Sequence, residues 1–230
     1  MISYTNYKNT YPADYGLTKN MFYNPETLNI FTDSSLSKGR AYGAIFVNQN
    51  DLLFKDIREE SGNTNNVLEL MGIRLALGYI PRLSPYYAYI NIFSDSAYAL
   101  EMLKDGVFKW TFNGNQYLDR HGNVAKNQDI LLEITNILLT LVLRYNIRVN
   151  LMFVPSHVGT REYEMYEALR TFSRMNNVSK NTKVDINLVR YLCLFNNYID
   201  REVRNLSMIS AINDKKFEEA ITFYPAYTQV

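Results

Sequence analysis

The chain of 230 residues is long enough for one domain with a complete hydrophobic core, and it leaves room for extensions. It is 47% apolar and 20% charged, a composition that is typical of globular proteins and argues against wholesale disorder. With 24 basic and 23 acidic residues, the formal net charge is +1. Proteins that hold nucleic acid through global electrostatics are strongly basic, so this balance permits a nucleic-acid partner without requiring one.

Cysteine content and hydropathy exclude several further classes. The lone Cys193 excludes an intramolecular disulfide and any zinc site built from cysteines, and its apolar neighbours predict a buried thiol. The amino-terminal residues are polar and lack the apolar core of a signal peptide. No uninterrupted apolar stretch approaches the roughly 18 residues of a membrane span. We therefore expect a soluble, cytoplasmic protein that makes no membrane contact.

The first predicted elements are strands. Residues 1–25 are rich in Tyr and Asn without a clear period, and we interpret them as an N-terminal extension. Three runs with strand character follow, over 28–32, 41–47 and 52–57, and the turn residues 48–51 separate the last two. Connections this short force neighbouring strands to run antiparallel, so we expect a meander.

Helices and strands alternate in the rest of the chain. Thr64 or Asn65 is the expected N-cap of an apolar helix, which Pro81 and Pro85 should end. The later elements are expected to be a strand over 89–93, a helix over 94–103 opening at Asp95, a loop over 106–122, a helix over 127–145, a strand over 147–154, a helix over 160–175, and a helix or broken pair over 184–206. This order predicts an α/β fold, with a mixed five-stranded sheet (three antiparallel strands, then two parallel) and helices on both faces.

Three acidic residues occupy similar positions on these elements. Asp33 and Asp95 each end a run with strand character, and Glu69 lies in the first turns of the apolar helix. Carboxylates that are carried on rigid elements and face one cleft are the ligands that a pair of Mg²⁺ ions needs, whereas three pooled negative charges without a cation are unfavourable. The spacing therefore indicates metal-dependent phosphodiester chemistry. The alternative for Asp95 is that it only caps the helix that follows.

Four segments, taken in order, resemble the type 1 ribonucleases H. They are Phe31-Thr-Asp-Ser-Ser35, Asn63-Thr-Asn-Asn-Val-Leu-Glu-Leu-Met71, Phe93-Ser-Asp-Ser-Ala-Tyr98 and Val154-Pro-Ser-His-Val-Gly159. The resemblance implies a ribonuclease H-like fold in which Asp33, Glu69 and Asp95 are catalytic metal ligands. The last segment is similar to the loop that carries the family's mobile catalytic His, which implies that His157 moves protons or assists product release.

The resemblance departs from the family pattern after His157. Members of the family carry a fourth carboxylate, an Asp, shortly after this His, where this chain offers Glu167. A better match appears later, in Phe195-Asn-Asn-Tyr-Ile-Asp-Arg-Glu-Val-Arg-Asn205, and we favour its Asp200 as the fourth catalytic metal ligand. This choice makes 160–195 a helical insertion within a ribonuclease H-like domain of residues 26–210, which a C-terminal tail over 211–230 follows.

Polar residues beside the expected metal site are candidates for substrate binding. The minor groove of a hybrid duplex is wide and shallow and displays 2′-hydroxyls, so polar side chains can contact sugars, phosphates and base edges there. The alternative for the residues that precede Glu69 is that they only cap the helix. The substrate-binding candidates are Ser34, Ser35, Thr64, Asn65 and Asn66.

The resemblance implies endonucleolytic hydrolysis of the RNA strand of RNA–DNA hybrids by two Mg²⁺ ions, for which Mn²⁺ can substitute. Two alternatives are a DNA nuclease of the same fold, of the resolvase or integrase type, and a non-catalytic nucleic-acid-binding domain. Glu69 favours hybrid cleavage, because integrase-like enzymes usually take their glutamate from a later helix. The insertion and the tails are candidate docking sites for a replication protein.

Overall fold

The computed structural model describes residues 17–36, 40–60, 63–159 and 161–206. The predicted C-terminal tail (211–230) and most of the predicted N-terminal extension lie outside the described residues.

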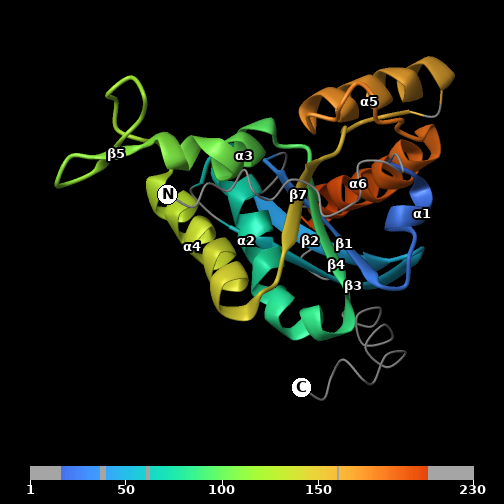
Figure 1. The fold of residues 1–230 in the computed structure, drawn as a ribbon, viewed down its shortest axis with the longest axis horizontal. Coiled ribbons are helices and arrows are strands. Elements are labelled where there is room, and N and C mark those ends of the chain that lie inside the picture. Colours follow the sequence, from blue (N-terminus) through green and yellow to red (C-terminus); the bar gives the residue numbers. More distant parts are fainter. Residues whose placement is uncertain (1–16, 37–39, 61–62, 160, 207–230) are drawn as a thin grey trace.

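A mixed five-stranded sheet forms the centre of the molecule (Figure 1). Its strands lie in the order β3-β2-β1-β4-β7, in which β1, β2 and β3 pair antiparallel and β1, β4 and β7 pair parallel. Tight turns impose the antiparallel pairs, and helical crossovers permit the parallel ones. The strand bounds are β1 Thr27–Ser35, β2 Ala41–Asn48, β3 Asp51–Glu59, β4 Tyr89–Ser94 and β7 Val149–Phe153. The predicted fold class is confirmed.

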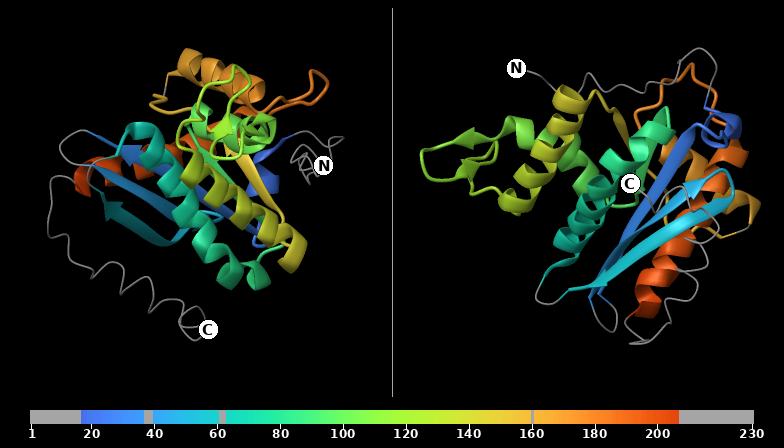
Figure 2. Two further views of the ribbon diagram at one scale, coloured as in Figure 1. Left: turned by 90° about the vertical axis from the view of Figure 1, so that its left-hand side faces the viewer. Right: turned by 90° about the horizontal axis from the view of Figure 1, so that it is seen from below.

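Helices cover both faces of this sheet (Figure 2). On one face α2 (Asn65–Leu83) packs on β1 and β2 and is flanked by α4 (Gln128–Tyr145). On the other face α6 (Ile186–Leu206) packs on β1 and β2 and contacts α5 (Glu162–Met175). The segment that we expected as one helix or a broken pair is therefore one continuous helix. Among the described residues, no helix combines the length and the apolar character needed to cross a membrane.

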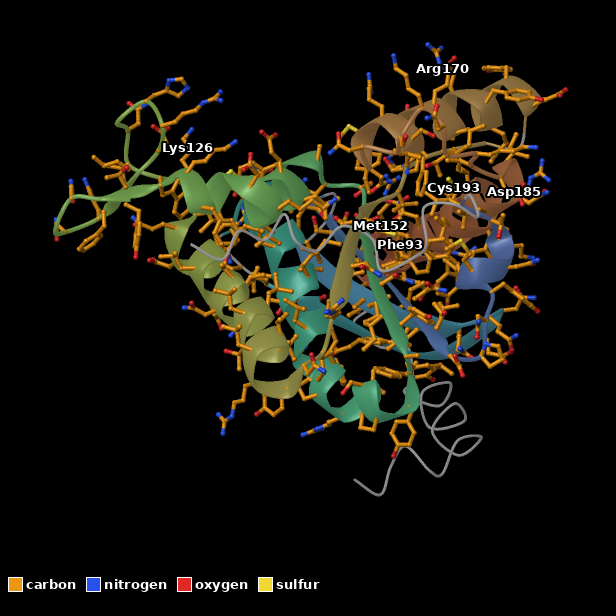
Figure 3. All side chains as sticks on the ribbon, viewed as in Figure 1. Phe93, Lys126, Met152, Arg170, Asp185 and Cys193 are labelled. Carbon is orange, nitrogen blue, oxygen red and sulfur yellow. The ribbon has the colours of Figure 1, made fainter. Side chains whose placement is uncertain are left out.

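The central strand β1 separates two hydrophobic clusters. All nine of its residues are buried, because helices cover both of its faces. Ile30 packs in the cluster of α2 and α4, whereas its neighbour Phe31 packs in the cluster of α6, as the alternation of side chains along a strand requires. Figure 3 labels three members of the second cluster, Phe93, Met152 and Cys193. The prediction that Cys193 is buried is confirmed.

The prediction that Pro81 ends its helix is wrong. Proline removes one helical hydrogen bond and crowds the preceding turn, which normally stops a helix. Here α2 continues through Pro81 to Leu83. Ile80 is fully buried and Leu83 is nearly so, both in the α2 cluster. Burial of these two side chains outweighs the local cost of the proline at this end of the helix.

The region after Asp95 also differs from the prediction. Helix α3 (Ala97–Glu101) starts two residues later than expected, and its N-cap is Ser96, whose hydroxyl accepts the Ala99 N–H. The alternative that Asp95 only caps the following helix is therefore wrong, because Ser96 is the cap. A π-helical turn (Met102–Gly106) and a short 3-10 helix (Val107–Lys109) continue the chain. The expected loop contains a hairpin of β5 (Thr111–Phe112) and β6 (Tyr117–Leu118), which projects from the body in Figure 1.

The described part of the predicted N-terminal extension packs against the domain. Leu17 forms a parallel bridge with Val184, and the short helix α1 (Lys19–Phe22) follows it. Phe22 is fully buried in the α6 cluster, and its carbonyl accepts a hydrogen bond of 2.9 Å from Asn29 Nδ2 on β1. Residues 17–22 thus complete the α6 side of the core.

Candidate active site

Three carboxylates meet at one edge of the sheet. Thr32 on β1 lies opposite Ser94 on the parallel strand β4, so the next residue on each, Asp33 and Asp95, leave the same edge. Helix α2 carries Glu69 to this edge. The ligand oxygens of these three acidic side chains all lie within 4.8 Å of one another. The structure therefore brings together the three acidic residues singled out from the sequence, and we call them the acidic trio.

Two members of the acidic trio are buried and incompletely hydrogen-bonded, and Asp95 is half-buried. Asp33 and Glu69 are 4% and 5% exposed. Among the described residues, Asp33 Oδ2 and Glu69 Oε2 have no hydrogen-bond partner. A buried polar atom without a partner costs about 1–3 kcal/mol, and more when it is charged. Hard divalent cations bind carboxylate oxygens, so these residues fit a metal of that kind.

Burial raises the pKa of all three carboxyl groups, and repulsion within the trio raises it further for Asp33 and Glu69. For Asp33 burial is the largest cause, followed by the charges of Asp95 and Glu69, and its pKa rises to about 9. Burial, followed by the charge of Asp95, raises the pKa of Glu69 to about 8. Burial also raises the pKa of Asp95, against a hydrogen bond with Ser156 that lowers it. A divalent cation would offset the same burial and repulsion by supplying positive charge.

Ser34 orients the acidic trio from within. Its hydroxyl donates a hydrogen bond of 2.7 Å to Glu69 Oε1, and its backbone N–H donates one of 2.6 Å to Asp33 Oδ1. The same hydroxyl lies 3.2 Å from Asn65 Oδ1. Ser34 and Ser35 are both buried. The Ser34 hydroxyl, a substrate-binding candidate, is therefore directed at Glu69.

The other substrate-binding candidates lie at the start of α2. The N-cap was expected at Thr64 or Asn65, and the structure has it at Thr64. The side chain of Thr64 makes no capping hydrogen bond. Its carbonyl accepts the N–H groups of Val67 and Leu68. Thr64, Asn65 and Asn66 are all exposed. Capping therefore does not occupy the Thr64 hydroxyl.

A glycine that the sequence analysis did not single out brings α2 close to the sheet. A Cβ at Gly72 would lie 3.3 Å from the Gly43 carbonyl oxygen and 3.4 Å from Thr32 Cβ, so any larger side chain would push the helix outward. Gly72 lies three residues after Glu69 and so on the same side of the helix. The signal was a glycine inside an apolar helix, where glycine is unfavourable unless packing requires it.

The loop after β7 brings His157 to the same edge of the sheet. His157 has a left-handed φ of +54°, and its side chain is 61% exposed. Its Nδ1 lies 3.7 Å from Asp200 Oδ2 on α6. Asn197 Nδ2, also on α6, donates a hydrogen bond of 3.1 Å to the Val158 carbonyl. Helix α6 therefore holds the loop that presents His157.

The two candidates for the fourth carboxylate lie in different surroundings. The charge of Asp200 contributes to the raised pKa values of all three members of the acidic trio, so Asp200 lies within electrostatic reach of them. Its side chain is 16% exposed. Glu167 is exposed on α5, where it pairs with Arg170 at 2.8 Å, and Figure 3 labels Arg170 on the outer side of that helix. The structure places Asp200 near the acidic trio, outside the group of ligand oxygens within 4.8 Å of one another, and leaves Glu167 in solvent.

Comparison with known proteins agrees with this geometry. The RNase H family model matches residues 25–171, which include the acidic trio and His157. The chain therefore belongs to the RNase H family. The match ends before Asp200, so the family comparison does not reach the fourth carboxylate. A comparison with curated protein sequences found no match.

Several solved structures are similar to this chain. RNase H1 from the halophilic archaeon Halobacterium salinarum NRC-1 is 15% identical, with 63% of this chain and 98% of that one covered and a TM-score of 0.39. The PFV RNase H domain is 14% identical, with coverages of 78% and 98% and a TM-score of 0.45. LC11-RNase H1, solved in complex with an RNA/DNA hybrid, is 11% identical, with coverages of 67% and 95% and a TM-score of 0.41.

Proposed function

We propose that this protein is a metal-dependent endonuclease that hydrolyses the RNA strand of RNA–DNA hybrids. The observation that carries the proposal is the acidic trio, in which two buried carboxylate oxygens lack a hydrogen-bond partner among the described residues. A purely structural cluster of this kind would be destabilising, whereas a divalent cation would offset its charge. Membership of the RNase H family supports phosphodiester hydrolysis as the use of such a site.

Four carboxylates are the proposed ligands for two Mg²⁺ ions, with Mn²⁺ as a substitute. They are Asp33, Glu69, Asp95 and Asp200, all from rigid strand ends or helices. Bound divalent cations would supply an activated water and a stabilised leaving oxygen for in-line displacement at phosphorus. The chain itself contributes the orientation of these ligands. Ser34 fixes Glu69 through a hydrogen bond of 2.7 Å, and Ser156 fixes Asp95.

His157 is the proposed group for proton movement or product release. Its exposed ring lies on a loop beside Asp200, which is itself a proposed metal ligand. An imidazole ring can both donate and accept a proton, which suits this role.

The exposed start of α2 is the proposed contact with the hybrid. Thr64, Asn65 and Asn66 lie one turn before Glu69, so a duplex that reached the acidic trio would pass them. Their hydroxyl and amide groups can donate and accept hydrogen bonds with 2′-hydroxyls in a shallow minor groove. The positive end of the α2 dipole would also favour a phosphate there. We propose that Ser34 acts on substrate through Glu69.

A substrate panel tests this proposal. Labelled RNA–DNA hybrid, double-stranded RNA, double-stranded DNA and a four-way junction would be incubated with the full chain, with Mg²⁺ or with EDTA. We expect cleavage of the RNA strand of the hybrid alone, only with Mg²⁺, and none by Asp33→Asn. Cleavage of DNA instead would favour a DNA nuclease of the same fold. Binding of the hybrid without any cleavage would favour a non-catalytic domain.

A further inference from the structure

Asp200 differs from the acidic trio because the protein itself supplies its counter-ions. Arg204, one turn later on α6, places Nε 2.7 Å from Asp200 Oδ1. Asp200 Oδ2 lies 3.7 Å from His157 Nδ1. Both carboxylate oxygens of Asp200 therefore face a basic side chain, whereas Asp33 and Glu69 each keep a buried oxygen that has no partner among the described residues.

The same guanidinium contacts the ring of His157. Arg204 Nη2 lies 3.3 Å from His157 Nε2. A guanidinium carries only donors, so this contact is a hydrogen bond only when Nε2 is the unprotonated ring nitrogen. The ring proton then lies on Nδ1, which faces Asp200. Arg204, Asp200 and His157 thus form a closed set of contacts, which we call the latch.

We propose that Arg204 is a positioning residue that holds Asp200 and His157 in the latch until a divalent cation competes for Asp200. The proposal rests on the proposed function in one respect, which is that Asp200 is the fourth metal ligand. A cation and a guanidinium compete for the same carboxylate oxygens, because each needs their lone pairs and repels the other charge. Binding of a cation to Asp200 therefore opens the latch and frees the His157 ring.

The surroundings confine this exchange to side chains. Lys55 on β3 pairs with Glu202 at 2.5 Å, and Asn197 holds the Val158 carbonyl, so α6 is tied to the sheet and to the loop on both sides of Asp200. The side chain of Arg204 is 51% exposed and can turn into solvent when it loses its partner. Helix α6 does not need to move for Asp200 to change partners.

The pair is weak enough for a cation to displace it. Ion pairs with one exposed partner contribute little, and pairs four residues apart on a helix are at the low end of that range. Removing the guanidinium should therefore tighten the weaker of two cation sites by about two- to fivefold. The tighter site, which the acidic trio supplies, should keep its affinity, because Arg204 pairs with the fourth carboxylate.

A Mn²⁺ titration of the full chain without nucleic acid tests the latch, with bound ions counted by electron paramagnetic resonance. We expect two classes of site in the original protein and a two- to fivefold tighter weak site in Arg204→Gln. Arg201→Gln is the matched control, because it removes the same charge from the same helix, where Arg201 lies against Glu202 and the Tyr198 ring. In an Asp200→Asn background, Arg204→Gln should change neither affinity.

Equal effects of Arg204→Gln and Arg201→Gln would overturn the latch, as would an effect that persists in the Asp200→Asn background or a single class of site in every variant. If Arg204→Gln loses helical circular dichroism, Arg204→Lys replaces it. A lysine cannot contact Asp200 and His157 together as the fork of arginine does, so the weak site should again tighten, by a smaller factor. No hybrid is present, so loss of the proposed cleavage would leave this result standing.

Discussion

Two clusters of polar side chains lie four residues apart along β1 and β4. The side chains of one cluster hydrogen-bond to one another, whereas the other cluster leaves carboxylate oxygens without a partner among the described residues. Asn29 and Asn91 lie on β1 and β4, and Asp33 and Asp95 follow them at the edge of the sheet. Residues four apart on a strand point to the same face, so Asn29 and Asp33 both point to the α6 side of β1. Glu69 reaches the acidic trio from α2, on the other face. The first cluster also contains Asn150 of β7, and we call it the amide ladder.

The amide ladder satisfies its side chains across three strands. Asn91 Nδ2 donates to Asn29 Oδ1 and Asn150 Nδ2 donates to Asn91 Oδ1, each at 2.9 Å, in register with the strand pairing. Buried polar groups that are paired in this way stabilise one register of a sheet. The acidic trio leaves oxygens unpaired at the other end of the same strands. In these two clusters the unpaired oxygens belong to the proposed metal site, and the paired amides belong to the framework of the sheet.

The largest expected effect is on the acidic trio. Asp33→Asn should lower hybrid cleavage by on the order of a thousandfold or more, because it removes a charged metal ligand. In EDTA near neutral pH the same variant should be more stable than the original protein, because it removes a carboxyl group whose pKa burial raises to about 9 in the folded state. Cleavage rates and urea unfolding would measure the two changes. If Asp33→Asn lost both activity and stability, the acidic trio would stabilise the fold as the amide ladder does, and the contrast between the two clusters would be wrong.

Breaking the amide ladder should have the reverse pattern. Asn91→Ala leaves Asn29 and Asn150 without their shared partner, and it should lower the free energy of unfolding by about 2–4 kcal/mol. Cleavage should remain measurable at temperatures where the variant is folded. Thermal unfolding followed by an activity assay on the folded protein would test this. Unchanged stability would show that the ladder is not a structural device.

The fourth carboxylate should have an intermediate effect. Asp200→Asn should lower cleavage by about 10- to 100-fold, because one proposed metal ligand is lost while the acidic trio remains. Glu167→Gln is the matched control, and it should change the rate by less than about twofold, since exposed ion pairs contribute little. Steady-state rates at saturating Mg²⁺ would compare them. A larger loss of cleavage in Glu167→Gln than in Asp200→Asn would indicate that Glu167 on α5 is the fourth metal ligand.

The last expected effect is a pH dependence of the free energy of unfolding in EDTA. The folded pKa values of Asp33 and Glu69 are raised to about 9 and about 8, above their ordinary values of 3.8 and 4.5. The folded protein therefore binds more protons than the unfolded chain between about pH 4 and pH 9, so stability falls as pH rises through that range. The slope is at most about 1.4 kcal/mol per pH unit for each carboxyl group.

Denaturant unfolding at several pH values would measure this slope. The double variant Asp33→Asn with Glu69→Gln should have a flatter profile, because the two groups no longer titrate. Mg²⁺ should also reduce the fall, since a cation binds the ionised carboxylates of the folded state. The amide ladder has no titratable group, so we expect it to add no pH dependence to the free energy of unfolding. A stability that rose from pH 5 to pH 8 in EDTA only in the original protein would contradict the shifts.

Much of this protein follows from its sequence alone. The strands, the meander and the long helices follow from apolar periodicity and turn residues, which act over a few positions and need no knowledge of the rest of the chain. The acidic trio was also predictable, because each carboxylate lies in a local motif at the end of a strand or in the first turns of a helix. The close approach of Asp33 and Asp95 then follows from the parallel pairing of β1 and β4.

Only the tertiary structure decided the remainder. Burial of Ile80 and Leu83 carries α2 through Pro81, against its local preference. Three contacts join residues that are distant in the chain: Ser34 with Glu69, Asn29 with Asn91, and His157 with Asp200. Such contacts depend on how helices and strands pack against one another, and packing is a property of the whole fold that no local pattern encodes.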